Sequence, residues 1–392
     1  MRLVLFVIGS LVLACSSTEG GDSGGAGSGG KAGGGAPGGG TAGSTGGGSS
    51  GSGSGGTAGG SAGTVGSSGS GGDVGTSGSG GSAGTGGSSG GSTGAWACPA
   101  GPFDADPVPD ANTAEPIAGV PPDDNYQENG FHIIEGPVWF EGALYVSQIT
   151  GIGSPPKSRI IKSLDGAVTV PLGDIGTNGL AIDNTGALLG ARHLDGSISK
   201  LDPANAANAM AVISMHDGAR FNCPNDIVVR SDGNLYFSDP NYQAPDPTPQ
   251  AATRVYRVAP GATTADVVDE SLDNPNGMLL TLDENTLYVT HPNGMVQYPL
   301  NADGSVGGGS PVNGMPGGDG MGMDCAGNIY MTGGNAVVVY SPDMTEIDSI
   351  DLPENSTNVA FGGPERKTLF ITTLGNTARA YSIELNVPGK PY

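Results

Sequence analysis

The sequence predicts an all-β fold, a six-bladed β-propeller, between residues 98 and 392. Three observations support this prediction. The segment contains six internal repeats, each repeat holds two apolar runs joined by a turn rich in Gly, Asp or Asn, and no helical periodicity is sustained anywhere in it. Units of about 40 to 50 residues that supply four antiparallel strands are typical of propeller blades.

The repeats share one layout: a polar residue, a short apolar run, a turn and a second apolar run. They are EGPVWFEGALYVSQI from Glu135, NGLAIDNTGALLGARH from Asn178, NDIVVRSDGNLYFSDP from Asn225, NGMLLTLDENTLYVTHP from Asn276, DGMGMDCAGNIYMTGG from Asp319 and NVAFGGPERKTLFITTL from Asn358. Their first residues are separated by 43, 47, 51, 43 and 39 positions. The turns have hairpin chemistry and the runs are rich in Val, Ile, Leu and Tyr, so each repeat predicts a β-hairpin with room for two further strands.

The end of the chain predicts how the ring of blades closes. The sixth unit supplies only NVAFGG, TLFITT and ARAYSIEL, one strand fewer than a four-stranded blade needs. The segment GFHII, just before Glu135, stands where the other units have their fourth strand. We therefore expect this N-terminal strand to complete the last blade and remove an open sheet edge.

The first 97 residues predict that the protein is exported, and they are not expected to form part of the propeller. MRLVLFVIGSLVLAC has one cation followed by an apolar run too short to span a bilayer, and VLAC resembles a bacterial lipobox that ends at a lipidated Cys15. An ordinary cleaved signal peptide is the alternative. Residues 16–97 are almost wholly Gly, Ser, Thr and Ala, which predicts a disordered tether. We expect a domain anchored by lipid to the bacterial envelope, and Ser16 and Ser17 favour the outer membrane.

Charge and cysteine content exclude other classes. The chain has 38 acidic and 15 basic residues, so nucleic acid is not an expected partner. Besides Cys15 there are Cys98, Cys223 and Cys325, which allow at most one disulfide within the domain, and no CxxC zinc motif is present. We expect a monomer.

The polar residues that begin the six repeats form the main candidate site. The first strand of each blade lines the channel of a propeller, so these residues should converge on one mouth of that channel. They are two carboxylates and four carboxamides: Glu135, Asn178, Asn225, Asn276, Asp319 and Asn358. Such a ring of oxygen donors suits one hard divalent cation, with Ca²⁺ preferred and Mg²⁺, Mn²⁺ or, in vitro, Zn²⁺ as alternatives. Each residue taken alone could instead serve a turn.

Several of these motifs resemble the family of gluconolactonase, senescence marker protein (regucalcin) and related calcium-dependent lactonases. The similar stretches are EGPVW, RFNCPNDIVVRSDGNLYFSDPNY, NPNGM, DGMGMD and TNVAFGGPERKTLFIT, and the resemblance extends from about residue 130 to residue 388. It implies a propeller fold and metal ligands at Glu135, Asn225, Asn276 and Asp319. One departure is HLDGSISKLD, where many members carry a basic turn, and this leaves the substrate open.

The resemblance also implies roles for residues outside the metal set. Arg220, Asn222 and Asn178 would bind the substrate, a small lactone. Asp319 is the first candidate for the general base, and Asp239 and His193, at the ends of second strands, are weaker candidates.

The implied activity is metal-assisted hydrolysis of a cyclic carboxylic ester (EC 3.1.1.-). No GxSxG elbow or HExxH motif offers another hydrolytic mechanism. Two alternatives remain. One is a non-catalytic surface-binding propeller braced by calcium, and the other is a related propeller hydrolase that acts on a different ester or a phosphoester.

Overall fold

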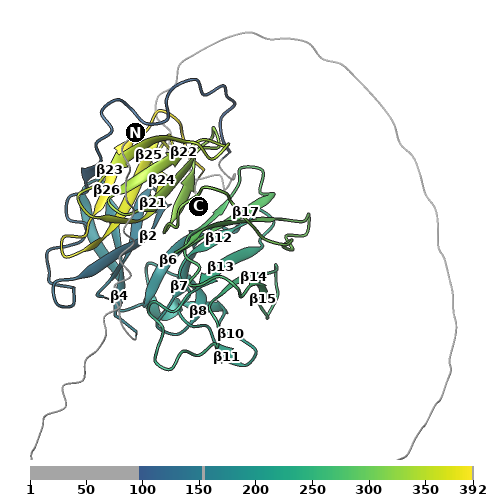
Figure 1. The fold of residues 1–392 in the computed structure, drawn as a ribbon. Helices are drawn as coiled ribbons and strands as arrows, with labels where there is room; N and C mark the ends of the chain where they lie inside the picture. Colours follow the sequence, from purple (N-terminus) through teal and green to yellow (C-terminus); the bar gives the residue numbers. More distant parts are fainter. Residues whose placement is uncertain (1–96, 152–154, 391–392) are drawn as a thin grey trace, which may run out of the picture. The chain divides into compact units, whose positions relative to one another are not determined.

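The computed structural model describes residues 97–151 and 155–390, and these residues form an all-β domain (Figure 1). Within them there are 26 strands and one three-residue 3-10 helix, Ala206–Asn208. The predicted signal segment and nearly all of the predicted tether, residues 1–96, lie outside the described residues. No helix in the described part of the chain is long and apolar enough to cross a membrane.

All six predicted hairpins are confirmed as antiparallel strand pairs. They are β2 (His132–Phe140) with β3 (Ala143–Ile149), β6 (Thr177–Ile182) with β7 (Leu188–Arg192), β12 (Ile227–Val229) with β13 (Leu235–Asp239), β16 (Met278–Leu280) with β17 (Thr286–His291), β20 (Met321–Met323) with β21 (Ile329–Gly333), and β24 (Asn355–Gly362) with β25 (Thr368–Gly375). The turn-forming Gly, Asp and Asn residues were therefore a sufficient local signal for these pairs.

Outer strands extend these hairpins into sheets. The four middle hairpins each gain two strands: β8 (Ser197–Leu201) and β9 (Met210–Ile213), β14 (Arg254–Val258) and β15 (Asp266–Asp269), β18 (Gly294–Pro299) and β19 (Ser310–Pro311), β22 (Ala336–Tyr340) and β23 (Glu346–Asp351). The first hairpin gains β4 (Ser158–Leu164) and β5 (Ala167–Leu172), and the last gains β26 (Ala380–Glu384) and β1 (Glu115–Pro116). A short ribbon, β10 (Met215–His216) with β11 (Ala219–Arg220), stands apart.

The first and last hairpins join in one eight-stranded sheet, and here the expectation for GFHII was wrong. His132 and Ile133 are the start of β2 and pair with Gly375 and Leu374 of β25. The outermost position beside β26 is taken instead by Glu115–Pro116. Figure 1 shows the blue and yellow ends of the described chain side by side for this reason. GFHII extends an inner strand because a bulge between Glu135 and Val138 lets β2 bend and pair on both sides.

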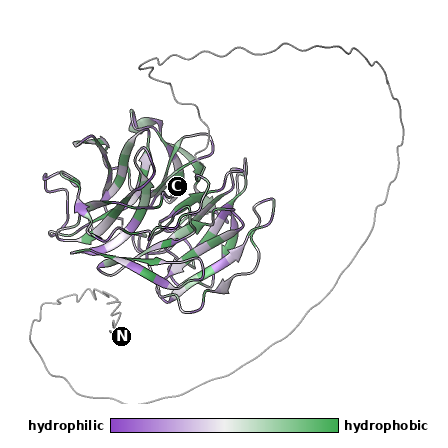
Figure 2. Cartoon of the chain, turned by 90° about the horizontal axis from the view of Figure 1, so that it is seen from above, coloured by the Kyte–Doolittle hydropathy of each residue, from purple (hydrophilic) through white to green (hydrophobic). Residues whose placement is uncertain are grey.

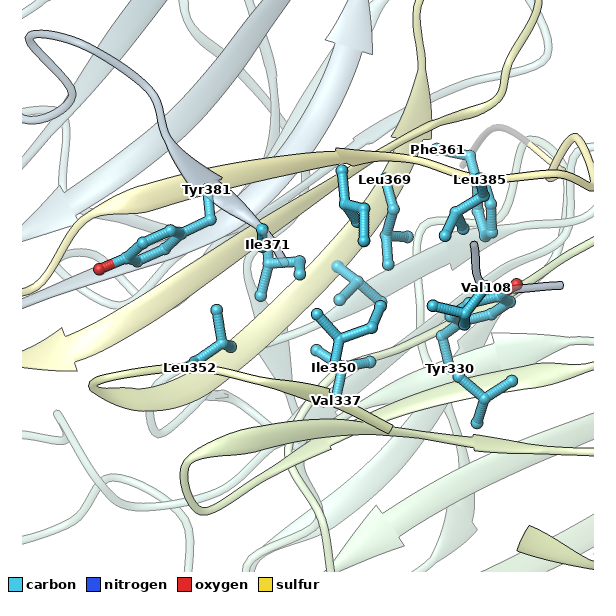
Figure 3. Close-up of a cluster of buried hydrophobic side chains, with 14 residues drawn as sticks. Val108, Tyr330, Val337, Ile350, Leu352, Phe361, Leu369, Ile371, Tyr381 and Leu385 are labelled. Carbon is cyan, nitrogen blue, oxygen red and sulfur yellow. The ribbon is translucent and has the colours of Figure 1, made fainter. Parts of the chain in front are cut away.

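The hydrophobic core lies between neighbouring sheets. Figure 2 shows hydrophobic residues along the strands and hydrophilic ones in many of the connecting loops. The cluster in Figure 3 packs Tyr330 and Val337 of one sheet against Phe361 and Leu369 of the next, and Val108 of the N-terminal segment joins it. Each such side chain stabilises the fold by about 1.5–3 kcal/mol when it is fully buried.

Hydrogen bonds link the inner strands of successive sheets. Near the ends of β3, β13, β17 and β21, a hydroxyl group donates to a carbonyl at the start of the next repeat. Examples are Ser238 to the Asn276 carbonyl and Thr290 to the Asp319 carbonyl, both at 2.7 Å. The last repeat follows a related pattern, because Thr357 Oγ1 donates to the Ile134 carbonyl of β2 at 2.7 Å. In keeping with these bonds, each first strand contacts the first strand of the next sheet, and β24 contacts β2.

The chain ends of the domain are fastened to one hairpin turn. Cys98 and Cys325 form a disulfide, and Cys223 is a free, buried thiol. Cys325 lies in the turn between β20 and β21, at the far end of β20 from Asp319. Its N–H donates to the Pro388 carbonyl, so the C-terminal segment lies on the same turn.

A substitution of Thr357 by Val tests the link between the last and first repeats. The variant keeps the side-chain shape but leaves the buried Ile134 carbonyl without its donor, which should lower the free energy of unfolding by about 1–3 kcal/mol. Urea unfolding followed by fluorescence measures this. The control is Thr368→Val at the partly exposed start of β25, with an expected change within about 0.5 kcal/mol. Equal losses in the two variants would contradict a special role for this link.

Candidate metal centre and active site

The six leading residues occupy equivalent backbone positions. Asn225, Asn276 and Asp319 lie two residues before their strands, and the backbone N–H of each donates to a carbonyl at the end of the partner strand, at 2.9, 2.8 and 3.0 Å. Glu135, Asn178 and Asn358 lie inside longer strands, each at a bulge. We call these six residues, together with Asp226 described below, the channel ring.

Small residues after the leading residues let the repeats approach one another. A Cβ at Gly179 would lie 2.4 Å from the Asn225 carbonyl oxygen, and a Cβ at Gly277 would lie 2.1 Å from that of Asp319. Any side chain there would collide with backbone that cannot move aside. Glycine after the leader is therefore required for close contact between inner strands, which the sequence alone suggested only as turn chemistry.

Asp226 is a site residue to which the sequence analysis gave no role. It follows Asn225 at the position that holds glycine in four other repeats, and it is buried. Its carboxylate accepts the N–H of Met278 in the next repeat at 2.9 Å. The sequence does contain a sign of this role, namely an acid at the position where four other repeats have glycine. A carboxylate at that position must face the crowded inner strands.

Three carboxyl groups of the channel ring have raised pKa values. Burial, with the charge of Asp226, raises the pKa of Glu135 to about 8. Burial raises the pKa of Asp226 to about 6, and burial with both other acids raises that of Asp319 well above its usual range. No Lys or Arg forms an ion pair with any of the three within the described residues. The ring is therefore short of positive charge.

The carboxamides of the channel ring also favour binding of a cation. Asn358 Nδ2 donates to Glu135 Oε2 at 3.3 Å, and Asn276 supports Asp319 by a side-chain hydrogen bond. The Oδ1 atoms of Asn178 and Asn276 are buried and have no hydrogen-bond donor among the described residues. Buried oxygen atoms without donors, beside three clustered acids, form a donor set suited to a hard divalent cation. Among the described residues, Asp, Glu, His and Cys side chains alone form no group of three or more that could hold a metal ion.

The loop between β13 and β14 covers part of the channel ring and supplies two further residues that the sequence analysis missed. Gln243 is buried, and its Oε1 accepts from Asn178 Nδ2 at 3.5 Å. Tyr242 donates from its hydroxyl to the Asn274 carbonyl at 3.3 Å, and its pKa is raised by burial and by the charge of Asp319. Asn276 and Asp319 retain partial exposure while Glu135 and Asn178 are buried. The ring is thus most accessible from the side of Asn276 and Asp319.

The predicted substrate-binding residues on the RFNCPND stretch make bonds within the protein. Asn222 is buried, with Nδ2 donating to the Ala252 carbonyl at 3.1 Å and Oδ1 accepting from the Gln250 N–H at 2.8 Å. The Arg220 guanidinium donates to the carbonyls of His193, Leu194, Phe221 and Asn222. Both side chains hold neighbouring loops in place, a use that sequence spacing did not reveal.

The two weaker base candidates lie in this second cluster. Asp239 is buried and accepts the N–H groups of Asn222 and Cys223 at 2.9 and 2.8 Å, and burial raises its pKa to about 7. His193 is buried with Nε2 at 3.0 Å from the Pro156 carbonyl, and burial lowers its pKa to about 4. The charged groups that influence the two are Arg192, Asp195, Arg220 and Arg254, and none of these belongs to the channel ring.

The ring acids predict how stability depends on pH in the absence of a cation. Their pKa values are raised in the folded state, so their contribution is complete below the usual carboxyl pKa and is lost as pH rises towards about 8. In a chelator, the urea midpoint should therefore fall more between pH 5 and 8.5 for the wild type than for Glu135→Gln. Addition of Ca²⁺ at the higher pH should reverse the fall. Parallel curves for the two proteins would contradict the assignment.

Asn222→Ala separates a structural role from a substrate contact. If the side chain only holds the 240–252 loop, the variant should lose about 1–3 kcal/mol of stability for each buried group left unpaired. Asn241→Ala, at an exposed position of the same loop, is the matched control. A raised KM with wild-type stability would instead support the substrate contact predicted from the sequence.

Comparison with known proteins identifies the family of the chain. The family profile described as the SMP-30/gluconolactonase/LRE-like region matches residues 133–375. A gluconolactonase of Zymomonas mobilis is 27% identical over 280 residues, which cover 62% of this chain and 77% of that protein. A pentonolactonase of Haloferax volcanii is 34% identical over 141 residues, 33% of this chain and 47% of the relative.

A solved structure shows the same similarity in three dimensions. The gluconolactonase of Xanthomonas campestris superposes with a TM-score of 0.55 at 28% identity, over 65% of this chain and 86% of that one. The family profile spans more than half of the chain and contains every residue of the channel ring. The chain belongs to the SMP-30/gluconolactonase/LRE-like family.

Proposed function

We propose that this protein is an exported, metal-dependent hydrolase of a lactone. The observation that carries the proposal is the channel ring, which combines three acids of raised pKa with buried carboxamide oxygens that lack donors, and no cationic side chain of the described residues pairs with the acids. The relatives named gluconolactonase and pentonolactonase support a small sugar lactone as the substrate.

Five residues of the ring have proposed parts in the reaction. Glu135, Asn225, Asn276 and Asp319 would hold one divalent cation, with Ca²⁺ preferred because all four ligands are oxygen atoms. When bound, such a cation supplies Lewis-acid polarisation of an ester carbonyl. Asp319 would take a proton from water on its carboxylate oxygen, and its partial exposure supports this role. Asn178, fixed by Gln243, would orient the substrate.

We further propose that the domain is a closed six-bladed propeller. The support is the succession of four-stranded groups and the hydrogen bonds that join the start of each repeat to the previous one, with Thr357 returning to Ile134. Such an arrangement brings the six leading residues to one mouth of a single channel.

Export and anchoring are proposed on separate grounds. The Cys98–Cys325 disulfide supports an oxidising compartment, because such bonds are rare in the cytosol. The lipobox-like VLAC at Cys15 supports attachment to the bacterial envelope, with the outer membrane preferred. We expect the domain to act as a monomer.

A second candidate is a non-catalytic binding propeller that uses the cation only as a brace. One observation favours it: Arg220 and Asn222, the expected substrate contacts, are engaged with backbone groups of the protein. Turnover separates the two candidates, because a brace changes stability and leaves lactone concentrations unaltered.

The test is hydrolysis of gluconolactone and a pentonolactone by the purified protein. Activity should require Ca²⁺ and disappear on chelation, and Asp319→Asn should lower kcat/KM by about 100-fold or more. Asp303→Asn, in an exposed hairpin turn, is the control and should retain full activity. Stabilisation by Ca²⁺ without turnover of any lactone would reject the enzyme and favour the binding propeller.

A further inference from the structure

A second cavity, of about 500 Å³, lies outside the channel ring. Its walls are the N-terminal segment 119–127 and the turn 376–379 between β25 and β26, and its inner side is formed by His132 and Gln148. We call it the rim cavity. No residue of the channel ring lines it, so it is distinct from the proposed metal centre.

The first wall of the rim cavity is held rigidly. The Arg159 side chain, 7% exposed, donates to both carboxylate oxygens of Asp124 at 2.6 and 2.7 Å and lies 4.2 Å from the ring centroid of Tyr126. Gln148 also holds this segment, because its Oε1 accepts from Arg159 and its Nε2 donates to the Tyr126 carbonyl. The Tyr126 hydroxyl donates to Asp174 at 2.8 Å. A segment fixed by this many bonds forms a wall before any ligand arrives.

The second wall is fixed through the backbone. Thr373 Oγ1 donates to the Arg379 carbonyl and accepts the Arg379 N–H, at 3.0 and 2.8 Å. The guanidinium of Arg379 is exposed and forms no ion pair with any residue that the structure describes. The second wall therefore carries a cationic group without an ion-pair partner among the described residues, on a backbone that hydrogen bonds hold in place.

His132, on the inner side, has one ring nitrogen that is buried and has no partner among the described residues. The residue is 5% exposed, and its Nε2 lies 3.0 Å from the Ala378 carbonyl, which only accepts hydrogen bonds. Nε2 must then carry the proton, which leaves Nδ1 as a bare acceptor without a partner among the described residues. Burial, followed by the nearby charge of Arg159, lowers the pKa of His132 and keeps this acceptor state.

These groups define the chemistry of a ligand. The free guanidinium of Arg379 suits a carboxylate, and the carboxamides of Asn125 and Asn376 suit hydroxyl groups. The volume is in the range of small-molecule sites. We propose that the rim cavity binds a polyhydroxylated carboxylate, the chemical class of a sugar acid.

The choice of this ligand rests on the proposed function. Hydrolysis of a sugar lactone adds water across the ester: the acyl carbon–oxygen bond breaks, and the products are a carboxylate, a hydroxyl group and one proton. A sugar acid therefore forms at the channel ring. The rim cavity would retain it outside the ring and leave the metal centre open for the next lactone.

Titration calorimetry with gluconate tests the proposal on the whole folded domain in a chelator. Wild type and Glu135→Gln should bind gluconate equally, and Arg379→Gln should bind it at least about 10-fold more weakly. Lys157→Gln removes an exposed cation that does not line the cavity and should bind as the wild type does. Glucitol, which lacks the carboxylate, should not distinguish wild type from Arg379→Gln.

The outcomes separate this inference from the lactonase proposal. Loss of gluconate binding in Glu135→Gln with retention in Arg379→Gln would place the acid at the channel ring and overturn the rim cavity. Absence of binding to the wild type would overturn it as well. Gluconate binding that depends on Arg379, in a protein that hydrolyses no lactone, would reject the proposed enzyme and keep the cavity assignment.

Discussion

The structure depends on hydrogen bonds between successive repeats at the start of their inner strands. Ser238, Thr290 and Thr357 each donate from a buried hydroxyl to a carbonyl of the neighbouring repeat. Their carbonyl partners belong to, or directly precede, the leading residues, so the bonds that join the sheets also fix the channel ring. Glycine at 179 and 277 permits the close backbone approach that these bonds need.

The close approach of the inner strands also brings three acidic side chains near one another, which is electrostatically unfavourable. Bringing Glu135, Asp226 and Asp319 together in a buried region raises the pKa of all three. A protein without a use for this arrangement could carry glycine at 226, as other repeats do at that position. Retaining an acid there costs stability unless a proton or a cation neutralises it, and this cost is the physical argument for a metal centre.

The second cluster, around Arg220, Asn222 and Asp239, shows what local sequence leaves undecided. Its residues are polar, lie beside the PND motif and match a pattern associated with substrate contacts, yet their hydrogen bonds run to backbone groups of the 193–252 region. Spacing along the chain cannot state whether a polar side chain faces a ligand or its own loop, because both need the same donors and acceptors. The same limit applied to Tyr242 and Gln243, which looked like ordinary loop residues and lie against the ring.

The sequence by itself determined the all-β class, the six hairpins and the register of the polar leading residues, because turn chemistry and alternating apolar runs act over a few residues. It also limited the disulfide to one pair among three cysteines. Only the tertiary structure decided that Cys98 joins Cys325, that Glu115–Pro116 rather than GFHII lies beside β26, and that the charge of Asp226 acts on Glu135 and Asp319. These outcomes depend on contacts between residues distant in the chain, and local patterns carry no information about which distant partner lies nearest.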